Sequence, residues 1–366
     1  MAPSYTRGSR HFRDEQKTEI SMMEGNRFLL RWVLPIAGSA LAIIVVLWLY
    51  RDLDVEIFLA SLTTAEPLFL LALGATILLE QLIRGWKWRQ ILYDLKPIPT
   101  LSLFGAILAG YGLAILIPLG VSPLVRAWLI ARLEGLRLAS VLVTTAIDRF
   151  IDGIVFAMFA GLVAFTAQIP GIEGNVNAGL ALAGALNFIL FSALLYVLFI
   201  GRSPLGRDDS RVSRWVDWLA VKGGRLFDGL RSAIRQGILW PRQRARQVGA
   251  VLASVLMKLL AATHFLWAGL SVGVVLDVLD YLFLMVFVGF ALVLARVIRV
   301  PGGFVIGSGL ALKLLGVADE LALAMILFTT VISKVLMVGT GCIVFWRSGV
   351  DIRTAKLSMA KSHDRA

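Results

Sequence analysis

The chain has 366 residues, 58% of them hydrophobic, and a formal net charge of +12 at pH 7. Apolar runs of about twenty residues recur along its length, which excludes a soluble globular protein and predicts helices that cross a membrane. The basic residues lie in loops beside these runs rather than in one patch interleaved with aromatic residues, so nucleic acid is excluded as the expected partner.

The predicted fold is all-α. The sequence lacks the short strands of alternating pattern that a membrane barrel needs, and a helix satisfies its own backbone hydrogen bonds in lipid. We therefore expect a polytopic helical membrane bundle with about six full spans and two broken, re-entrant hairpins in an inverted repeat.

The chain begins with an arginine-rich tail, residues 1–31, which the positive-inside rule assigns to the cytoplasm. The first span is predicted over residues 32–50 and leads to an acidic loop, residues 51–66, on the external side. The second span, residues 67–87, ends in basic residues and returns the chain to the cytoplasm.

The next segment, residues 101–138, is interrupted at Ile117-Pro118-Leu119-Gly120. The span after it leads to residues 168–175, which contain no Lys or Arg and are expected outside. The interrupted segment therefore has to begin and end inside. A re-entrant hairpin fits this parity better than two complete crossings, because proline and glycine break helices.

A polar stripe marks the span that follows this hairpin. Four residues have the i, i+3, i+4, i+7 spacing that puts side chains on one helix face: Thr145, Asp148, Arg149 and Asp152. Ionisable side chains in an apolar span normally face the bundle interior or a wet cavity, so the stripe is a candidate functional site. The two aspartates are expected to restrain Arg149.

In the second half, a span over residues 176–200 leads to a basic loop, residues 201–246. The loop is predicted to contain an amphipathic helix, either on the anionic cytoplasmic leaflet or packed on the bundle as a connector. Further spans are predicted over residues 248–270 and 321–346. Residues 282–315 lie between them as a second hairpin that enters from outside.

The two hairpins indicate an inverted repeat. Ile117-Pro118-Leu119-Gly120 is followed by Thr144-Thr145-Ala146-Ile147-Asp148-Arg149, and Val300-Pro301-Gly302-Gly303 is followed at a similar distance by Thr329-Thr330-Val331-Ile332-Ser333-Lys334. Lys334 is thus the counterpart of Arg149, and it is the freer cation because its stripe lacks the acids. In secondary transporters, such repeats build a site near the membrane midplane.

The predicted organisation has five parts. They are a cytoplasmic tail (residues 1–31), a first membrane repeat with a linking span (32–200), a basic cytoplasmic loop (201–246), a second membrane repeat (247–346) and a second cytoplasmic tail (347–366).

The candidate ligand-binding residues are the ionisable residues that the spans and hairpins bring to membrane depth: Glu80, Arg84, Arg126, Asp148, Arg149, Asp152, Lys258, Arg296, Arg299, Lys313 and Lys334. Glu80 and Arg84 are four residues apart on one helix and could pair. Cations outnumber carboxylates in this set. The predicted ligand is therefore anionic, an anionic phospholipid or a lipid-linked headgroup.

Two parts of this set have alternative interpretations. Asp148 with Arg149 or Asp152 could form a structural polar network that ties two helices together. Arg296 and Arg299 could be ordinary basic flanks if the segment before them crosses the membrane once.

No catalytic residue, metal ligand or cofactor is expected. The sequence has no Ser/His/Asp arrangement, metal-ligand cluster or phosphate-binding glycine loop, and its histidines are His11, His264 and His363. We therefore expect a protein that is not itself an enzyme.

Several short motifs resemble the lysylphosphatidylglycerol synthase transmembrane-domain family, whose members are also described as flippase-like. They are Arg84 with Trp86 or Trp88, Pro118 with Arg126, Asp148-Arg149-Phe150-Ile151-Asp152, and Pro301-Gly302-Gly303. The chain departs from the family pattern at Ser122-Pro123 and at Ser308, where glutamates are usual. The resemblance implies lipid handling in the cytoplasmic membrane, without the soluble aminoacyl-transfer domain that some members carry.

The leading hypothesis is a multi-pass, flippase-like lipid transporter of the cell membrane with both termini in the cytoplasm. The alternative is a non-transporting scaffold that recruits an envelope-synthesis or lipid-modifying enzyme through residues 201–246. A homo-oligomer fits either hypothesis.

Overall fold

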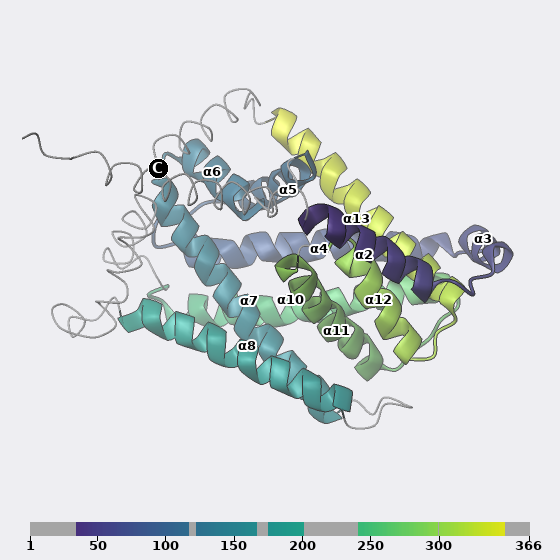
Figure 1. Ribbon diagram of the computed structural model, residues 1–366. Helices are drawn as coiled ribbons and strands as arrows, with labels where there is room; N and C mark the ends of the chain where they lie inside the picture. Colours follow the sequence, from purple (N-terminus) through teal and green to yellow (C-terminus); the bar gives the residue numbers. More distant parts are fainter. Residues whose placement is uncertain (1–33, 117–121, 167–174, 201–240, 299, 348–366) are drawn as a thin grey trace, which may run out of the picture.

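The computed structural model describes residues 34–116, 122–166, 175–200, 241–298 and 300–347, and every regular element in these ranges is an α-helix. In chain order the helices are α2 (Leu34–Leu49), α3 (Val55–Thr63), α4 (Pro67–Leu92), α5 (Thr100–Leu116), α6 (Ser122–Glu134), α7 (Leu138–Thr166), α8 (Asn175–Ile200), α10 (Arg244–Ser271), α11 (Val278–Val297), α12 (Gly303–Leu314) and α13 (Asp319–Arg347) (Figure 1).

Five of the described helices are long and apolar enough to cross a membrane, namely α4, α7, α10, α11 and α13. The prediction of a polytopic helical membrane bundle is therefore confirmed. Helix α11 has 20 residues and is about 30 Å long, which matches the hydrocarbon core of a bilayer. Helix α12 has 12 residues and is only about 18 Å long. The second predicted hairpin thus joins one helix of spanning length to one that is too short to span.

Helices α4 and α10 pack side by side in opposite directions through the middle of the bundle (Figure 1). At one end, the Asp94 carboxylate accepts a hydrogen bond of 2.8 Å from the backbone N–H of Arg242, and the Arg246 guanidinium lies 3.1 Å from the centre of the Tyr93 ring. At the other end, the backbone N–H of Glu66 donates to the Ser271 carbonyl over 2.9 Å.

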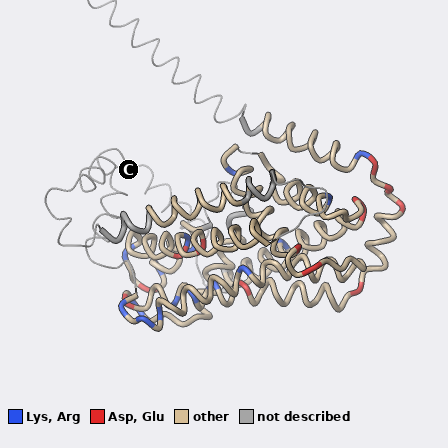
Figure 2. The backbone as a smooth tube through the Cα atoms, turned by 90° about the horizontal axis from the view of Figure 1, so that it is seen from below, with Lys and Arg blue, Asp and Glu red and all other residues tan. Residues whose placement is uncertain are grey.

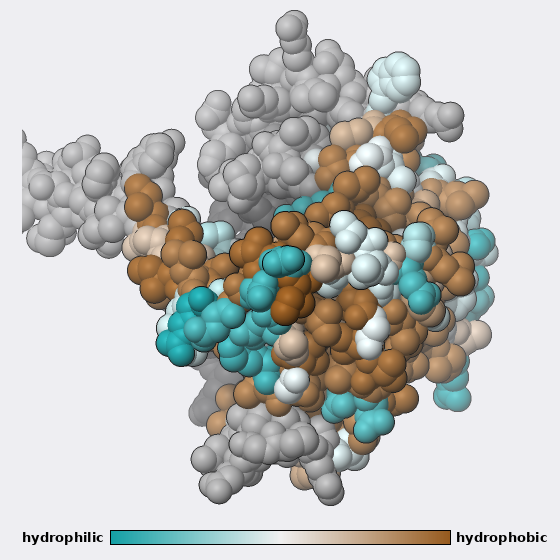
Figure 3. All heavy atoms as spheres, turned by 90° about the vertical axis from the view of Figure 1, so that its right-hand side faces the viewer, coloured by the Kyte–Doolittle hydropathy of each residue, from teal (hydrophilic) through white to brown (hydrophobic). Residues whose placement is uncertain are grey.

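The two ends of the described bundle differ in charge. Most Lys and Arg gather at the end where α4 finishes and α10 begins, here called the basic end, while Asp and Glu are prominent at the opposite, acidic end (Figure 2). Seen from the acidic end, hydrophilic residues form patches among the hydrophobic residues that make up most of the visible surface (Figure 3). This separation of charge is typical of a bundle that spans a membrane in one orientation.

Each predicted hairpin has both of its ends at one end of the bundle. Lys96, which precedes α5, pairs with Glu134 at the end of α6 over 2.8 Å, so α5 and α6 start and finish at the basic end. Helix α11 begins beside the end of α10, and Lys313 near the end of α12 pairs with Asp319 at the start of α13 over 2.9 Å. The start of α11 and the end of α12 therefore both lie at the acidic end.

Two boundaries differ from the sequence prediction. The loop predicted over residues 51–66 contains α3, because the Asp54 carboxylate caps that helix by accepting from the N–H groups of Glu56 and Ile57. The second span does not end at Lys87. It continues to Leu92, because Lys87 is buried between two carboxylates rather than exposed as a flank.

Apolar packing joins the two halves of the chain. One cluster of buried side chains connects α4 and α7 with α10, α11, α12 and α13, and a second connects α4, α5, α6 and α7. Helices α5 and α13 cross closely at Gly341, where a Cβ atom would overlap the Leu108 carbonyl oxygen. Helix α8 packs along α7, on the outside of the bundle (Figure 1).

Candidate functional site

The side chains of the predicted polar stripe on α7 point in two different directions. Asp148 is fully buried and Asp152 is 8% exposed, and Thr145 is buried beside them. Arg149 is exposed. Consecutive residues of an α-helix point about 100° apart, so the neighbour of a fully buried residue can face outward.

Lys87 of α4 is the counter-ion of both aspartates. Its Nζ lies 2.9 Å from Asp148 Oδ1 and 2.6 Å from Asp152 Oδ1, and it donates a further hydrogen bond of 3.0 Å to the Asp148 carbonyl oxygen. The side chain is fully buried. An ammonium at this depth is stabilised only by such close partners, because desolvation of a single charge is costly.

Arg126 of α6 is the second cation on Asp148. Its Nη2 lies 3.0 Å from Asp148 Oδ2, and its guanidinium stacks over the Trp88 ring at 4.9 Å from the centroid. The Trp88 indole N–H in turn donates to Thr144 Oγ1 over 3.2 Å. These contacts fix the short helix α6 between α4 and α7.

Helix α10 reaches the same carboxylates through Ser254. The Ser254 hydroxyl is buried and donates to Asp152 Oδ1 over 2.9 Å. Four helices, α4, α6, α7 and α10, therefore meet around two carboxylates. Removing one partner of such a buried network would leave a charge uncompensated.

A second group of polar side chains continues along α4. Arg84 pairs with Glu80 over 2.7 Å, which confirms the pairing predicted from their spacing, and it also donates to the Tyr111 hydroxyl of α5 over 2.9 Å. His264 of α10 has its Nε2 3.8 Å from the second oxygen of Glu80. This group links α4 to both α5 and α10.

Lys258 has no counter-ion among the residues that the structure describes. It lies one helical turn beyond Ser254 on α10, is partly buried, and has its Nζ 5.5 Å from the centre of the Phe156 ring. It has no hydrogen bond or ion pair in the part of the chain that the structure describes. Asp152, Arg84 and Glu80 lie close enough to act on it electrostatically.

We call the residues around these contacts the buried charge cluster, and its members are Glu80, Arg84, Lys87, Arg126, Asp148, Asp152 and Lys258. Four of them are basic and three are carboxylates, so the cluster carries one positive charge in excess. The excess charge falls on Lys258, because each of the other cations has a carboxylate within ion-pair distance.

The structure brings together only part of the predicted set. Arg149, Arg296 and Lys334 have exposed side chains and form no ion pair with any described residue. Lys313 pairs with Asp319 at the acidic end, and Arg299 lies outside the described residues. The expected restraint of Arg149 by the aspartates is wrong, because their ion pairs are with other residues.

Sequence reasoning missed Lys87, which it treated as a basic flank of the second span. A signal was present, because Glu80, Arg84 and Lys87 have i, i+4, i+7 spacing and form a charged stripe on α4 like the one on α7. Ser254 and Lys258 are likewise four residues apart. Tyr111 and Trp88 carry no comparable signal, because aromatic residues are common in membrane helices.

The bundle and the buried charge cluster define a multi-pass integral membrane protein that holds ionisable residues inside its helical core. Residues 35–341 match the sequence model of a family described as the lysylphosphatidylglycerol synthase TM region, and the chain belongs to this family. The match includes every residue of the buried charge cluster. No curated protein matches the chain significantly.

Proposed function

We propose that the protein is a flippase-like lipid transporter, which binds an anionic phospholipid or a lipid-linked headgroup at the buried charge cluster. Membership of the family supplies the membrane-lipid context. The observation that carries the proposal is Lys258, a partly buried ammonium group without a carboxylate partner among the described residues, in a cluster with one excess positive charge.

An ammonium without a counter-ion is costly inside a membrane protein. A phosphate group beside Lys258 would supply the missing negative charge and accept charge-assisted hydrogen bonds, which are about twice as strong as neutral ones. An anionic headgroup therefore completes the charge balance of the cluster. A cationic headgroup would increase the imbalance.

The position of the cluster also supports transport. It lies where α4 and α7 of the first half meet α10 of the second half. The packing partners correspond between halves, with α4–α5, α5–α6 and α6–α7 matched by α10–α11, α11–α12 and α12–α13. The contacts of α13 with α4 and α5 are likewise matched by those of α7 with α10 and α11. This correspondence supports the predicted inverted repeat, and transporters built from such repeats bind substrate between them.

The proposed orientation has the basic end in the cytoplasm of the cell membrane, following the positive-inside rule. Both termini are then cytoplasmic, and the pairs α5–α6 and α11–α12 act as broken hairpins that enter from opposite sides. In this proposal the chain carries out no group transfer itself, so chemistry on the lipid belongs to a separate protein.

Transport can be measured in proteoliposomes as the rate at which fluorescent phosphatidylglycerol in the inner leaflet becomes accessible to an impermeant reductant. We expect wild type to accelerate exchange and Lys258→Met to lower the rate by about tenfold or more, the value of one hydrogen bond to a charged group. Lys258→Arg should retain most of the activity.

The matched control is Lys334→Met, which removes an exposed lysine from α13. It should leave exchange unchanged, and fluorescent phosphatidylcholine should be exchanged more slowly than phosphatidylglycerol. Equal rates with and without wild-type protein would overturn the proposal and favour the scaffold hypothesis.

A further inference from the structure

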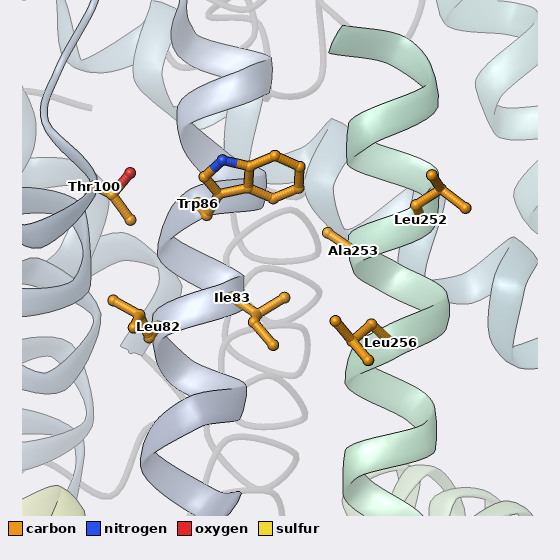
Figure 4. A pocket seen from close by; sticks show the side chains of 7 residues that line it. All are labelled: Leu82, Ile83, Trp86, Thr100, Leu252, Ala253 and Leu256. Atoms are coloured by element: carbon orange, nitrogen blue, oxygen red, sulfur yellow. The ribbon is translucent and has the colours of Figure 1, made fainter. Parts of the chain in front are cut away.

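An apolar groove of about 490 Å³ lies on the outside of the α4 and α10 pair, next to the start of α5. Figure 4 shows the Trp86 indole extending from α4 toward α10, with Ile83 below it and Leu252 and Leu256 opposite. The lining side chains are Leu82, Ile83, Trp86, Thr100, Leu252, Ala253 and Leu256. Five of these side chains are aliphatic, and the two that carry a polar group are Trp86, with its indole N–H, and Thr100, with its hydroxyl.

The groove is separate from the buried charge cluster. On α4, Leu82 and Trp86 point away from the face that carries Lys87, and on α10, Leu252 and Leu256 point away from Ser254. Leu252 is 60% exposed, Leu256 46% and Trp86 40%. These values describe an open groove that faces the lipid rather than the protein core.

The groove lies in the half of the bundle near the basic end. Trp86 precedes the end of α4 at Leu92 by less than two helical turns, about 9 Å along the axis, and Leu252 follows the start of α10 by about 12 Å. Gly249 forms the wall on that side, because a Cβ atom there would be 3.3 Å from the Trp86 ring. The indole therefore lies directly against the α10 backbone.

Three arginines that form no ion pair within the described part of the chain lie at the mouth of the groove, the end nearest the basic end. Arg89, Arg242 and Arg244 flank it at the end of α4 and the start of α10, and their side chains form no ion pair with any described residue. The nearby Asp94 carboxylate is engaged by a backbone N–H. Helices α5 and α10 both begin here, and a helix N-terminus carries positive partial charge. The mouth of the groove is therefore complementary to a phosphate group.

We infer that this groove binds one acyl chain of an anionic membrane phospholipid, whose phosphate group lies among Arg89, Arg242 and Arg244. A lipid chain fits an apolar surface that faces the bilayer, and the three arginines, which have no ion-pair partner among the described residues, select the headgroup by charge. The site does not depend on the proposed transport, because Leu82, Leu252 and Leu256 face away from the buried charge cluster and the groove can be occupied in a protein that moves no lipid.

Photo-crosslinking tests the site in the full chain reconstituted into nanodiscs. The probe is phosphatidylglycerol with a diazirine in one acyl chain, and labelled peptides are mapped by mass spectrometry. We expect residues 82–86 and 252–256 to be labelled several-fold more than Leu186 and Leu190 of α8, which are 59% and 56% exposed. A phosphatidylcholine probe should show less of this enrichment.

Substitutions at the mouth test the charge selection. Arg89→Gln and Arg244→Gln should each reduce the preference for the phosphatidylglycerol probe by about fivefold, the contribution of one basic residue near an anionic lipid surface. The matched control is Arg149→Gln, an exposed arginine on α7. Ala253→Leu, which fills the floor of the groove, should abolish the enrichment at residues 252–256.

Labelling in proportion to exposure along all helices, with either probe, would overturn the inference and identify only annular lipid. So would an unchanged preference in both arginine variants. Arg244→Gln changes an exposed side chain and should fold, so the test stands even if Arg89→Gln or Ala253→Leu does not. Loss of transport in the Lys258 variants would leave all of these results unaffected.

Discussion

Replacing Lys87 by methionine tests whether the buried charge cluster holds the bundle together. The change keeps the length and apolar stem of the side chain and removes the ammonium group that lies 2.9 Å from Asp148 and 2.6 Å from Asp152. Asp148 would then keep its ion pair with Arg126, and Asp152 would keep the hydrogen bond from the Ser254 hydroxyl. Asp152 would lose its only ion pair among the described residues.

The expected cost is about 3–5 kcal/mol of unfolding free energy, the usual range when one partner of a buried ion pair is removed. Lys87 also donates to the Asp148 carbonyl oxygen, so the loss should lie toward the upper part of that range. Stability can be measured by thermal unfolding of the purified protein in mild detergent, followed by tryptophan fluorescence. The matched control, Arg149→Met, removes an exposed cation one residue from Asp148 and should change stability by less than about 0.5 kcal/mol.

A double variant separates the ion pair from general disruption. Asp152→Asn removes a carboxylate that Lys87→Met leaves uncompensated, so the two changes together should cost less than the sum of their separate costs, by about 1–3 kcal/mol. Strict additivity, or equal stability of Lys87→Met and Arg149→Met, would refute the assignment of Lys87 as the counter-ion of both aspartates.

Three further predictions concern stability in the same unfolding assay. Ser254→Ala removes one hydrogen bond to the Asp152 carboxylate and should cost about 1.5–3 kcal/mol, whereas no effect would exclude α10 from the cluster. Gly341→Ala places a Cβ atom against the Leu108 carbonyl oxygen and should cost about 1–3 kcal/mol. Its control is Gly339→Ala, where a Cβ atom has open space. Equal costs for the two variants would contradict the close crossing of α5 and α13. Lys96→Ala breaks a partly exposed ion pair with Glu134 and should cost less than about 1 kcal/mol. The difference in unfolding free energy from wild type should shrink as salt is added. A cost that salt does not change would contradict an ion pair.

The sequence was sufficient to predict the helical membrane fold. Apolar runs are a property of composition, and they predicted a polytopic bundle of helices, five of which are long and apolar enough to span. The extra helix α3 was missed because charge alone indicates the side of the membrane. It does not show whether a loop folds locally, as the Asp54 cap makes residues 55–63 do.

The site was predicted less completely, because the burial of a side chain and the direction in which it points depend on the helices that pack around it. Lys87 looks like a flank in the sequence, yet α4 continues beyond it and the aspartates of α7 bury it. Arg149 and Lys334 look central in the sequence, yet they face outward. A comparison of the charged stripes on α4 and α7 would have found the pairing, since their charges are complementary.

The pairing of Lys87 with Asp148 also constrains how the protein is made. The two residues are 61 positions apart in the chain, so the ribosome completes α4 well before the carboxylates that neutralise its lysine. During that interval α4 carries a cation that is unfavourable in lipid, although Glu80 already compensates Arg84 within the same helix. A nascent chain that ends before α7 should therefore leave α4 only partly inserted, and translation of α7 should complete its insertion. The same contacts that join four helices in the folded bundle thus make the integration of an early helix depend on a later one.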